Sequence, residues 1–139
     1  MKTRTNINGV NGQSGFTLIE VIAVLVIVGM LAAVAIPRYL DMQTSAAANA
    51  VGGALAAGAS NVTMEYSNQL LSGTFTNLGD LATALNVANY TTVGDFTVSY
   101  AVSGAGTGID VTVTAAPDPI QGQMANIDAA KKLKTVVLQ

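Results

Sequence analysis

The sequence predicts an α+β fold in which one long N-terminal helix packs against a small antiparallel β-sheet. Residues 16–36 are almost wholly apolar, an alanine-rich stretch without proline follows to residue 71, and apolar residues alternate with others from about residue 95. Unbroken apolar runs and apolar residues at helical spacing favour a helix, whereas strict alternation favours strands. The chain has 139 residues, so we expect one domain beyond the apolar segment.

Composition excludes several classes of protein. The chain has no histidine and no cysteine, only 10% charged residues, and a net charge of −2. These absences exclude a disulfide framework, thiol or imidazole catalysis, and the usual zinc and haem sites. The negative charge argues against a dedicated nucleic-acid binder. We therefore expect a structural protein that is not an enzyme and that carries no cofactor or metal.

The apolar run at residues 16–36 has the length of a membrane-spanning helix. As a helix it measures roughly 31 Å, about the hydrocarbon thickness of a bilayer. The preceding residues 1–15 carry Lys2 and Arg4 and no acid. Because positive residues stay on the cytoplasmic side, we expect this leader to be cytoplasmic and the rest of the chain to lie outside.

Three kinds of membrane segment fit this pattern. It is a secretory signal peptide cleaved after Ala35, or an uncleaved single-pass anchor, or a segment kept on the mature protein after cleavage in front of it. The first two leave Glu20 unexplained within the apolar run. An ionisable residue there is costly and indicates a function.

The start of the apolar segment carries a specific motif. It reads Gly15-Phe16-Thr17-Leu18-Ile19-Glu20-Val21. With the basic leader, it resembles the type IV pilin family, which includes the pseudopilins of type II secretion. The resemblance covers residues 1–43 in detail and, beyond them, only the plan of a long helix followed by a small sheet domain. It implies that a prepilin peptidase removes residues 1–15 by cutting between Gly15 and Phe16, and then methylates Phe16.

The resemblance also implies a role for Glu20. In a filament, its carboxylate would meet the Phe16 amine of a neighbouring copy, and the cost of leaving it unpaired would fix the register of assembly. A local interpretation is also open. Thr17 and Glu20 have the spacing of a capping box for a helix that begins at Leu18.

Gly29 and Pro37 mark the weakest part of the predicted helix. In a helix interior, glycine costs about 1 kcal/mol and proline about 3 kcal/mol relative to alanine. Pilins commonly carry such residues here, which implies loosening of the helix in a filament. The alternative is a simple kink at the membrane exit. We assign residues 16–37 to the helix that spans the membrane or forms the filament core.

Residues 38–139 form the predicted outer domain, whose first part continues the helix to about Leu71. Its Gly52, Gly53 and Gly58 either permit close helix packing in a bundle or thin the helix where a sheet lies against it. The apolar or small residues at helical spacing are Leu40, Ala47, Val51, Leu55, Gly58, Val62, Tyr66 and Leu70.

Gly73 is the predicted stop of the long helix, and a short helix near residues 78–87 follows. The sheet is expected from about residue 95. Residues 95–103 and 109–113 alternate on either side of a glycine-rich turn, which predicts a hairpin. The predicted inward residues are Phe96, Val98, Tyr100 and Val102, and then Ile109, Val111 and Val113. Residues 133–138 are expected to add a third strand.

The remaining polar residues give weaker signals. The aspartates lie near turns and helix ends, where capping is their ordinary role. Asp110 and Asp118 are candidate calcium ligands by resemblance to some pseudopilins, without regular ligand spacing. Lys131, Lys132 and Lys134 form a basic cluster, which we interpret as protection of a sheet edge rather than a contact with nucleic acid.

We therefore predict a structural subunit of a type IV pilus-like helical filament, used for attachment, motility or uptake. Its expected partners are further copies of itself, the prepilin peptidase, an inner-membrane assembly platform and, before assembly, the membrane. The precursor would lie in the bacterial inner membrane and the product in an extracellular pilus. The alternatives are a pseudopilin acting as a periplasmic piston and a secreted or membrane-anchored periplasmic binding domain.

Overall fold

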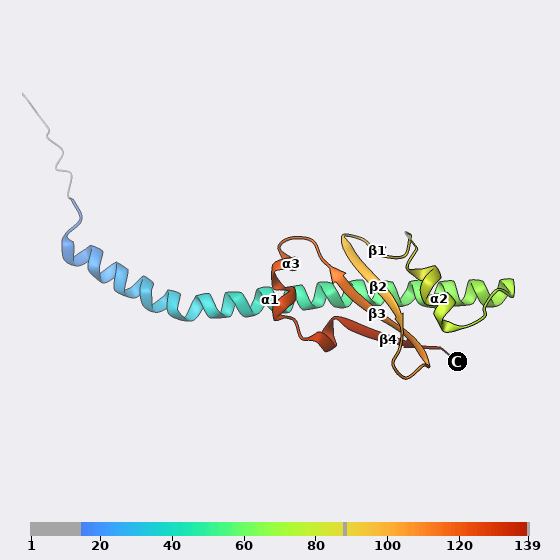
Figure 1. Cartoon of the computed structure of the whole chain (residues 1–139). Coiled ribbons are helices and arrows are strands. Elements are labelled where there is room, and N and C mark those ends of the chain that lie inside the picture. Colours follow the sequence, from blue (N-terminus) through green and yellow to red (C-terminus); the bar gives the residue numbers. More distant parts are fainter. Residues whose placement is uncertain (1–14, 88, 139) are drawn as a thin grey trace, which may run out of the picture. The chain divides into compact units, whose positions relative to one another are not determined.

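The computed structural model describes residues 15–87 and 89–138, and the chain forms two units that divide after Arg38 (Figure 1). Most of the predicted leader, residues 1–14, lies outside the described residues. In chain order the elements are α1 (Leu18–Ser72), α2 (Leu78–Leu85), β1 (Thr92–Val93), β2 (Phe96–Val102), β3 (Gly108–Ala115), α3 (Ile120–Gln123), 3₁₀ turns at Met124–Asn126 and Ala129–Lys131, and β4 (Leu133–Val137).

The predicted long helix is present as α1, which is helical without interruption through Gly29 and Pro37. The first unit holds the apolar half of α1, and its side chains are exposed. The second unit holds the other half, whose buried residues are Ala47, Val51, Ala54, Leu55, Gly58, Ala59 and Val62. The predicted apolar stripe was too long. Leu40 is 51% and Leu70 58% exposed, because they lie beyond the buried stretch of α1 that begins at Ala47 and ends at Val62.

The second unit contains one four-stranded antiparallel sheet in the order β1-β2-β3-β4. The predicted hairpin corresponds to β2 and β3, and the predicted third strand to β4. Tyr100 lies opposite Val111, which in turn lies opposite Lys134. The sheet begins earlier than expected, because the short β1 pairs with the start of β2. Val102 is 41% exposed rather than inward and buried, as it is the last residue of β2 before the turn.

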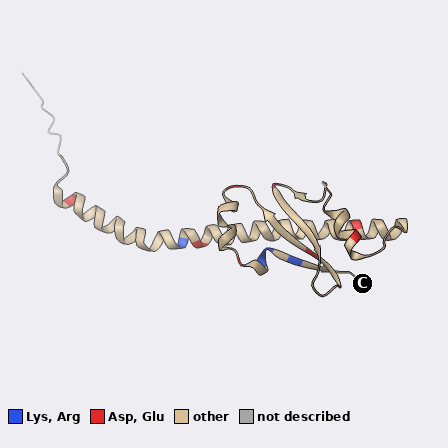
Figure 2. Ribbon diagram, viewed as in Figure 1, with Lys and Arg blue, Asp and Glu red and all other residues tan. Residues whose placement is uncertain are grey.

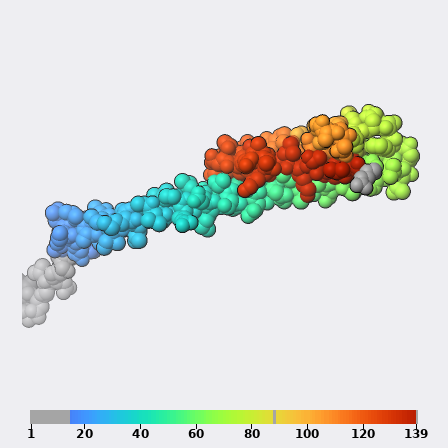
Figure 3. Space-filling view, turned by 90° about the horizontal axis from the view of Figure 1, so that it is seen from below, coloured from blue at the N-terminus to red at the C-terminus, as the bar shows by residue number. Residues whose placement is uncertain are grey.

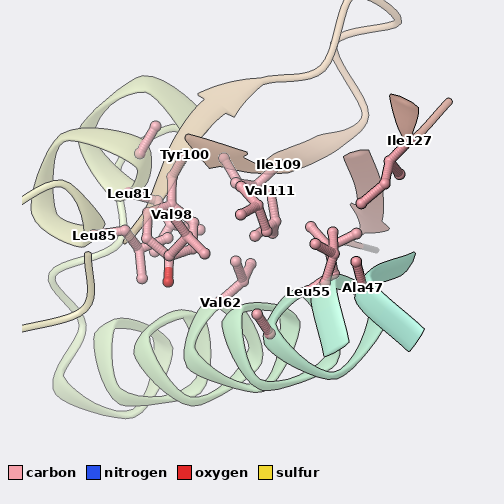
Figure 4. Close-up of a cluster of buried hydrophobic side chains, with 14 residues drawn as sticks. Ala47, Leu55, Val62, Leu81, Leu85, Val98, Tyr100, Ile109, Val111 and Ile127 are labelled. Atoms are coloured by element: carbon pink, nitrogen blue, oxygen red, sulfur yellow. The ribbon is translucent and has the colours of Figure 1, made fainter. Parts of the chain in front are cut away.

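The core of the second unit lies between the sheet, α1 and α2 (Figure 4). Val51 and Val62 of α1 and Leu81 and Leu85 of α2 are fully buried, as are Ile109 and Val111 of β3. Figure 3 shows the strands and the C-terminal segments lying along α1 in this unit. Burial of such apolar surface is the main force that holds a small sheet to a helix.

At Gly58 the backbone of α1 lies close to the sheet. A Cβ atom there would lie 2.7 Å from Val111 Cγ1, closer than van der Waals contact permits. By contrast, Cβ atoms on Gly52 and Gly53 would meet nothing within 4 Å. Gly58 therefore thins the helix beneath the sheet, which was one of the two interpretations of these glycines. The other two have no such role in the described residues.

A candidate assembly site at the start of the long helix

Thr17 caps the N-terminus of α1. Its carbonyl accepts hydrogen bonds from the N–H groups of Glu20, at 3.1 Å, and Val21, at 3.2 Å. Its hydroxyl accepts a further bond from the Glu20 N–H at 3.3 Å. The predicted start at Leu18 is confirmed, and one of the two bonds of the predicted capping box is present. The cap uses the backbone of Glu20, so it leaves the carboxylate available for another partner.

Phe16 and Glu20 lie beside one another on the surface of the first unit. They line a shallow groove with Val21, Val24 and Leu25. Phe16 is 83% exposed. The Glu20 carboxylate has neither a hydrogen bond nor an ion pair within the described residues. The structure therefore brings an unpaired anion and the predicted new N-terminus into one groove with otherwise apolar walls.

The rest of the first unit presents an apolar surface. Its large apolar side chains from Phe16 to Ile36 are all at least 47% exposed. Figure 2 shows how few charged residues this part of the chain carries. By length and composition, α1 is the one helix among the described residues that could cross a membrane. A surface of this kind is unfavourable in water and requires lipid or protein to cover it.

Gly29 and Pro37 are both within α1 and both exposed. A Cβ atom on Gly29 would meet nothing within 4 Å. Neither residue breaks the helix here, so its loosening stays a prediction. Because Gly29 has no side chain, another helix can approach the apolar surface closely at this position.

The candidate calcium ligands are not brought together. The Asp110 carboxylate accepts a hydrogen bond from the Thr135 hydroxyl at 2.6 Å, and Asp118 is exposed. The described residues hold no group of three or more acids that could bind a metal ion. Asp80 and Asp128 instead serve helix starts, the ordinary role expected for aspartates here. Asp80 receives a bond from Asn77 at 2.8 Å, and Asp128 accepts the N–H of Ala130 at 2.9 Å.

The three lysines lie in different surroundings. Lys131 ends a 3₁₀ turn, and the ammonium group of Lys132 donates to the Met124 carbonyl at 3.1 Å. Lys134 lies on β4, at an edge of the sheet, opposite the inward-facing Val111. A charged residue that points inward on an edge strand hinders the addition of a further strand. Lys134 thus occupies the position that the predicted edge protection requires.

The sequence did not predict a polar network around Tyr90, which lies in the segment between α2 and β1. The Tyr90 hydroxyl donates to Glu65 at 3.0 Å, and the Tyr100 hydroxyl donates to the Tyr90 carbonyl at 2.8 Å. The bond to Glu65 and the negative charge of that residue raise the pKa of Tyr90, and burial raises the pKa of Tyr100. No local pattern predicts these contacts, because the partners are distant in sequence. They bind the segment to α1 and to β2.

Comparisons with known proteins match the N-terminal part of the chain most strongly. Residues 10–36 match the family model described as the prokaryotic N-terminal methylation motif. The chain is 50% identical over 48 residues to the type IV major alpha-pilin of Moraxella bovis, covering 34% of this chain and 30% of that protein. It is also 50% identical over 48 residues to fimbrial protein Q of the same organism, covering 34% of this chain and 31% of the relative.

A longer match links the chain to fimbrial protein EcpC of Eikenella corrodens. The identity is 36% over 106 residues, which cover 73% of this chain and 62% of the relative. The chain thus spans less than two thirds of the length of each of these relatives, and no solved structure matches it. In its methylation motif, its long apolar helix and its small antiparallel sheet, the chain is similar to type IV pilins and fimbrial proteins.

Proposed function

We propose that the chain is the structural subunit of a type IV pilus-like filament that assembles through residues 16–37. One observation carries the proposal. The first unit exposes an apolar helix whose first turn places the unpaired Glu20 carboxylate in the same groove as Phe16. A role as the anchor of a single copy would explain the apolar surface but not this carboxylate.

The chemistry of assembly follows from removal of the leader. Cleavage between Gly15 and Phe16 creates a cationic amine one helical turn from Glu20. In an apolar bundle, each of these two charged groups can pair with the opposite group on another copy. Because an unpaired buried charge is strongly destabilising, packing arrangements that leave Glu20 alone are disfavoured. The pair therefore acts on register more than on total stability.

The apolar side chains of residues 16–36 supply the main driving force. They lie in lipid before assembly and against the same segment of other copies afterwards. Gly29 and Pro37 lower the helical stability of residues 29–37 by about 1 and 3 kcal/mol, respectively. This segment can open where neighbouring chains shield its backbone, and we assign to it the loosening of the helix in the filament.

The route to the filament involves three partners outside this chain. The precursor lies in the bacterial inner membrane with its leader in the cytoplasm. A prepilin peptidase cleaves it and methylates Phe16, and an assembly platform moves it into the growing filament. The pilus and fimbrial names of the relatives favour an extracellular pilus, used for attachment, motility or uptake, over a periplasmic pseudopilus. In this role the protein is structural rather than catalytic.

Mass spectrometry of the N-terminus tests the proposal. Protein sheared from the cell surface is compared with protein from the membrane fraction. The expected result is a sheared filament whose subunits begin with methylated Phe16. A terminus at Ile36 would identify an ordinary signal peptide, and an intact leader would identify a simple anchor. Either result would contradict the proposed function.

A further inference from the structure

Two segments of the chain carry the acceptor motif for N-linked glycosylation. The motif is an asparagine followed two residues later by serine or threonine, with any residue except proline between them. The sequence contains it as Asn61-Val62-Thr63 and as Asn89-Tyr90-Thr91. The first lies within α1, and the second lies in the segment between α2 and β1 (Figure 1). A transferase must reach both the carboxamide and the hydroxyl, so the surroundings decide which motif is a site.

The motif within α1 is closed to such an enzyme. Its middle residue, Val62, is fully buried in the core. The Asn61 Nδ2 donates to the Tyr100 hydroxyl at 3.4 Å. The Thr63 hydroxyl donates to the Ala59 carbonyl at 3.2 Å. Because residues two apart on a helix do not face the same way, one enzyme cannot contact both groups of this motif while α1 stays folded.

The motif after α2 has the opposite properties. Asn89 is exposed and lies in a turn, and Thr91 is half-buried and directly precedes β1. Neither the Asn89 carboxamide nor the Thr91 hydroxyl has a hydrogen bond within the described residues. A surface turn is backbone that an enzyme can bind without unfolding a helix or a strand.

The middle residue of this motif holds the segment against the fold. The Tyr90 hydroxyl donates to Glu65 at 3.0 Å, and the Tyr90 carbonyl accepts from the Tyr100 hydroxyl at 2.8 Å. The Thr91 carbonyl accepts an N–H group of β2 at 2.8 Å. These bonds use one side chain and two backbone carbonyls. They fix the place of the motif on the surface and leave the Asn89 carboxamide and the Thr91 hydroxyl unused.

We propose that Asn89 is a site of N-linked glycosylation. The Asn89 Nδ2 attacks the anomeric carbon of a sugar whose leaving group is a diphosphate. A carbon–nitrogen bond forms, the bond from the anomeric carbon to the diphosphate oxygen breaks, and its electron pair leaves with the diphosphate. The Nδ2 atom loses one proton, and nothing is oxidised or reduced. Nucleotide-linked sugars and lipid-linked oligosaccharides both carry this leaving group, so either class of donor fits the same acceptor.

The modification is compatible with the folded outer domain. Asn89 is exposed, so a sugar on its side chain displaces no buried group and breaks no hydrogen bond within the described residues. The inference goes beyond the proposed function, because it concerns the surface of the outer domain and does not depend on filament assembly.

Mass spectrometry of glycopeptides tests the site in the full-length protein. The protein is taken from the cells that make it naturally, from both the membrane fraction and the sheared material. Its peptides are fragmented by electron transfer, which keeps a sugar on the residue that carries it. The expected result is a sugar on Asn89 and none on Asn61. A lone hexose would identify a nucleotide-linked donor, and an oligosaccharide would identify a lipid-linked donor.

Variants of the motif sharpen the test. Asn89→Gln should abolish the modification, and so should Thr91→Ala, whereas Thr91→Ser keeps a hydroxyl and should keep the sugar. Thr63→Ala is the matched control, because it destroys the motif within α1 and should leave the occupancy of Asn89 unchanged. Thermal unfolding of each variant in detergent checks that the fold is retained. Thr91→Ser also separates loss of the hydroxyl from disturbance of the segment.

Three outcomes would overturn the proposal. The first is an unmodified Asn89 in wild-type protein from both fractions. The second is a sugar that persists in Asn89→Gln, which would place it on a hydroxyl group instead. The third is equal occupancy of Asn61 and Asn89, which would show that the folded surroundings do not select the site. None of these results bears on the filament, which the N-terminus of the sheared protein tests separately.

Discussion

The side chain of Asn86 pairs with the backbone of Tyr100 as a neighbouring strand would. Its Oδ1 accepts the Tyr100 N–H at 3.0 Å, and its Nδ2 donates to the Tyr100 carbonyl at 2.7 Å. The same Nδ2 donates to the Ala82 carbonyl at 2.9 Å in α2. Because β1 covers only Phe96 and Thr97, one amide completes the edge of β2 and fixes α2 to the sheet.

Replacing Asn86 should therefore loosen α2 from the sheet. Asn86→Ala leaves the Tyr100 N–H and carbonyl without partners, and we expect the free energy of unfolding to fall by about 1–2 kcal/mol. Denaturant unfolding of the full-length protein in detergent measures the change. Asn89→Ala, at an exposed residue with no hydrogen bond in the described part of the chain, should have almost no effect. If both variants lost the same free energy of unfolding, the hydrogen bonds between Asn86 and Tyr100 would contribute nothing to stability.

Two glycines of α1 should respond to alanine in opposite directions. In Gly58→Ala the new methyl group meets Val111 Cγ1 at 2.7 Å, so the sheet must shift and stability should fall by about 1–3 kcal/mol. In Gly53→Ala the methyl group meets nothing within 4 Å. This variant should gain about 1 kcal/mol, because alanine favours the helix. Thermal unfolding of the two variants measures both changes in stability. A higher stability for Gly58→Ala than for wild type would show that the sheet shifts without cost to make room for the methyl group.

The parts of the fold that sequence predicted are those with a local cause. The alternation of Val98 and Tyr100 and then of Ile109 and Val111 located β2 and β3, since strand burial has a period of two residues. The start of α1 followed from Thr17, because the hydroxyl at a helix start acts on an N–H three residues away.

The parts that sequence missed depend on distant partners. The strand β1 has two residues and so no periodicity to detect. Asn86 acts on a residue 14 positions away, which no spacing rule anticipates. Leu40 and Leu70 continue the helical pattern of the core, yet only tertiary structure decides where the sheet stops covering α1. For the same reason the roles of Gly52, Gly53 and Gly58 could not be predicted from sequence, since only the contact with Val111 distinguishes Gly58 from the other two.

Gly108 should tolerate no side chain. A Cβ atom at this first residue of β3 would overlap the Val136 carbonyl oxygen, a backbone atom that cannot move without separating β3 from β4. We expect Gly108→Ala to cost about 3 kcal/mol and to increase proteolysis of the C-terminal strand. Gly104→Ala is the matched control in the same turn, because its Cβ would meet nothing within 4 Å. Similar melting temperatures for the two variants would contradict this close approach.

Alkaline pH should weaken the attachment of Tyr90. Its pKa is raised above 10.0 in the folded protein by the hydrogen bond to Glu65 and by the charge of that residue. A raised folded-state pKa means that this stabilisation is complete below pH 10 and is lost as the pH rises through the folded value. Tyr90→Phe removes the effect, so its melting temperature should fall less steeply above pH 10 than that of wild type. Tyr39→Phe, at a side chain that is 62% exposed, should follow the wild-type curve.

Glu20 and Thr17 allow assembly to be separated from helix capping. If Glu20 acts only through its backbone at the cap, Thr17→Val should reduce sheared filament more than Glu20→Gln, since it removes the hydroxyl that accepts the Glu20 N–H. If the carboxylate pairs with a neighbouring amine, Glu20→Gln should lower the yield about tenfold, whereas Thr17→Val should keep most of it. Both proteins must first show the same processed N-terminus in the membrane fraction, which excludes a failure of cleavage. A Glu20→Gln filament of wild-type yield and length would show that the charge has no part in register, because a neutral amide of the same size would then satisfy every subunit contact equally well.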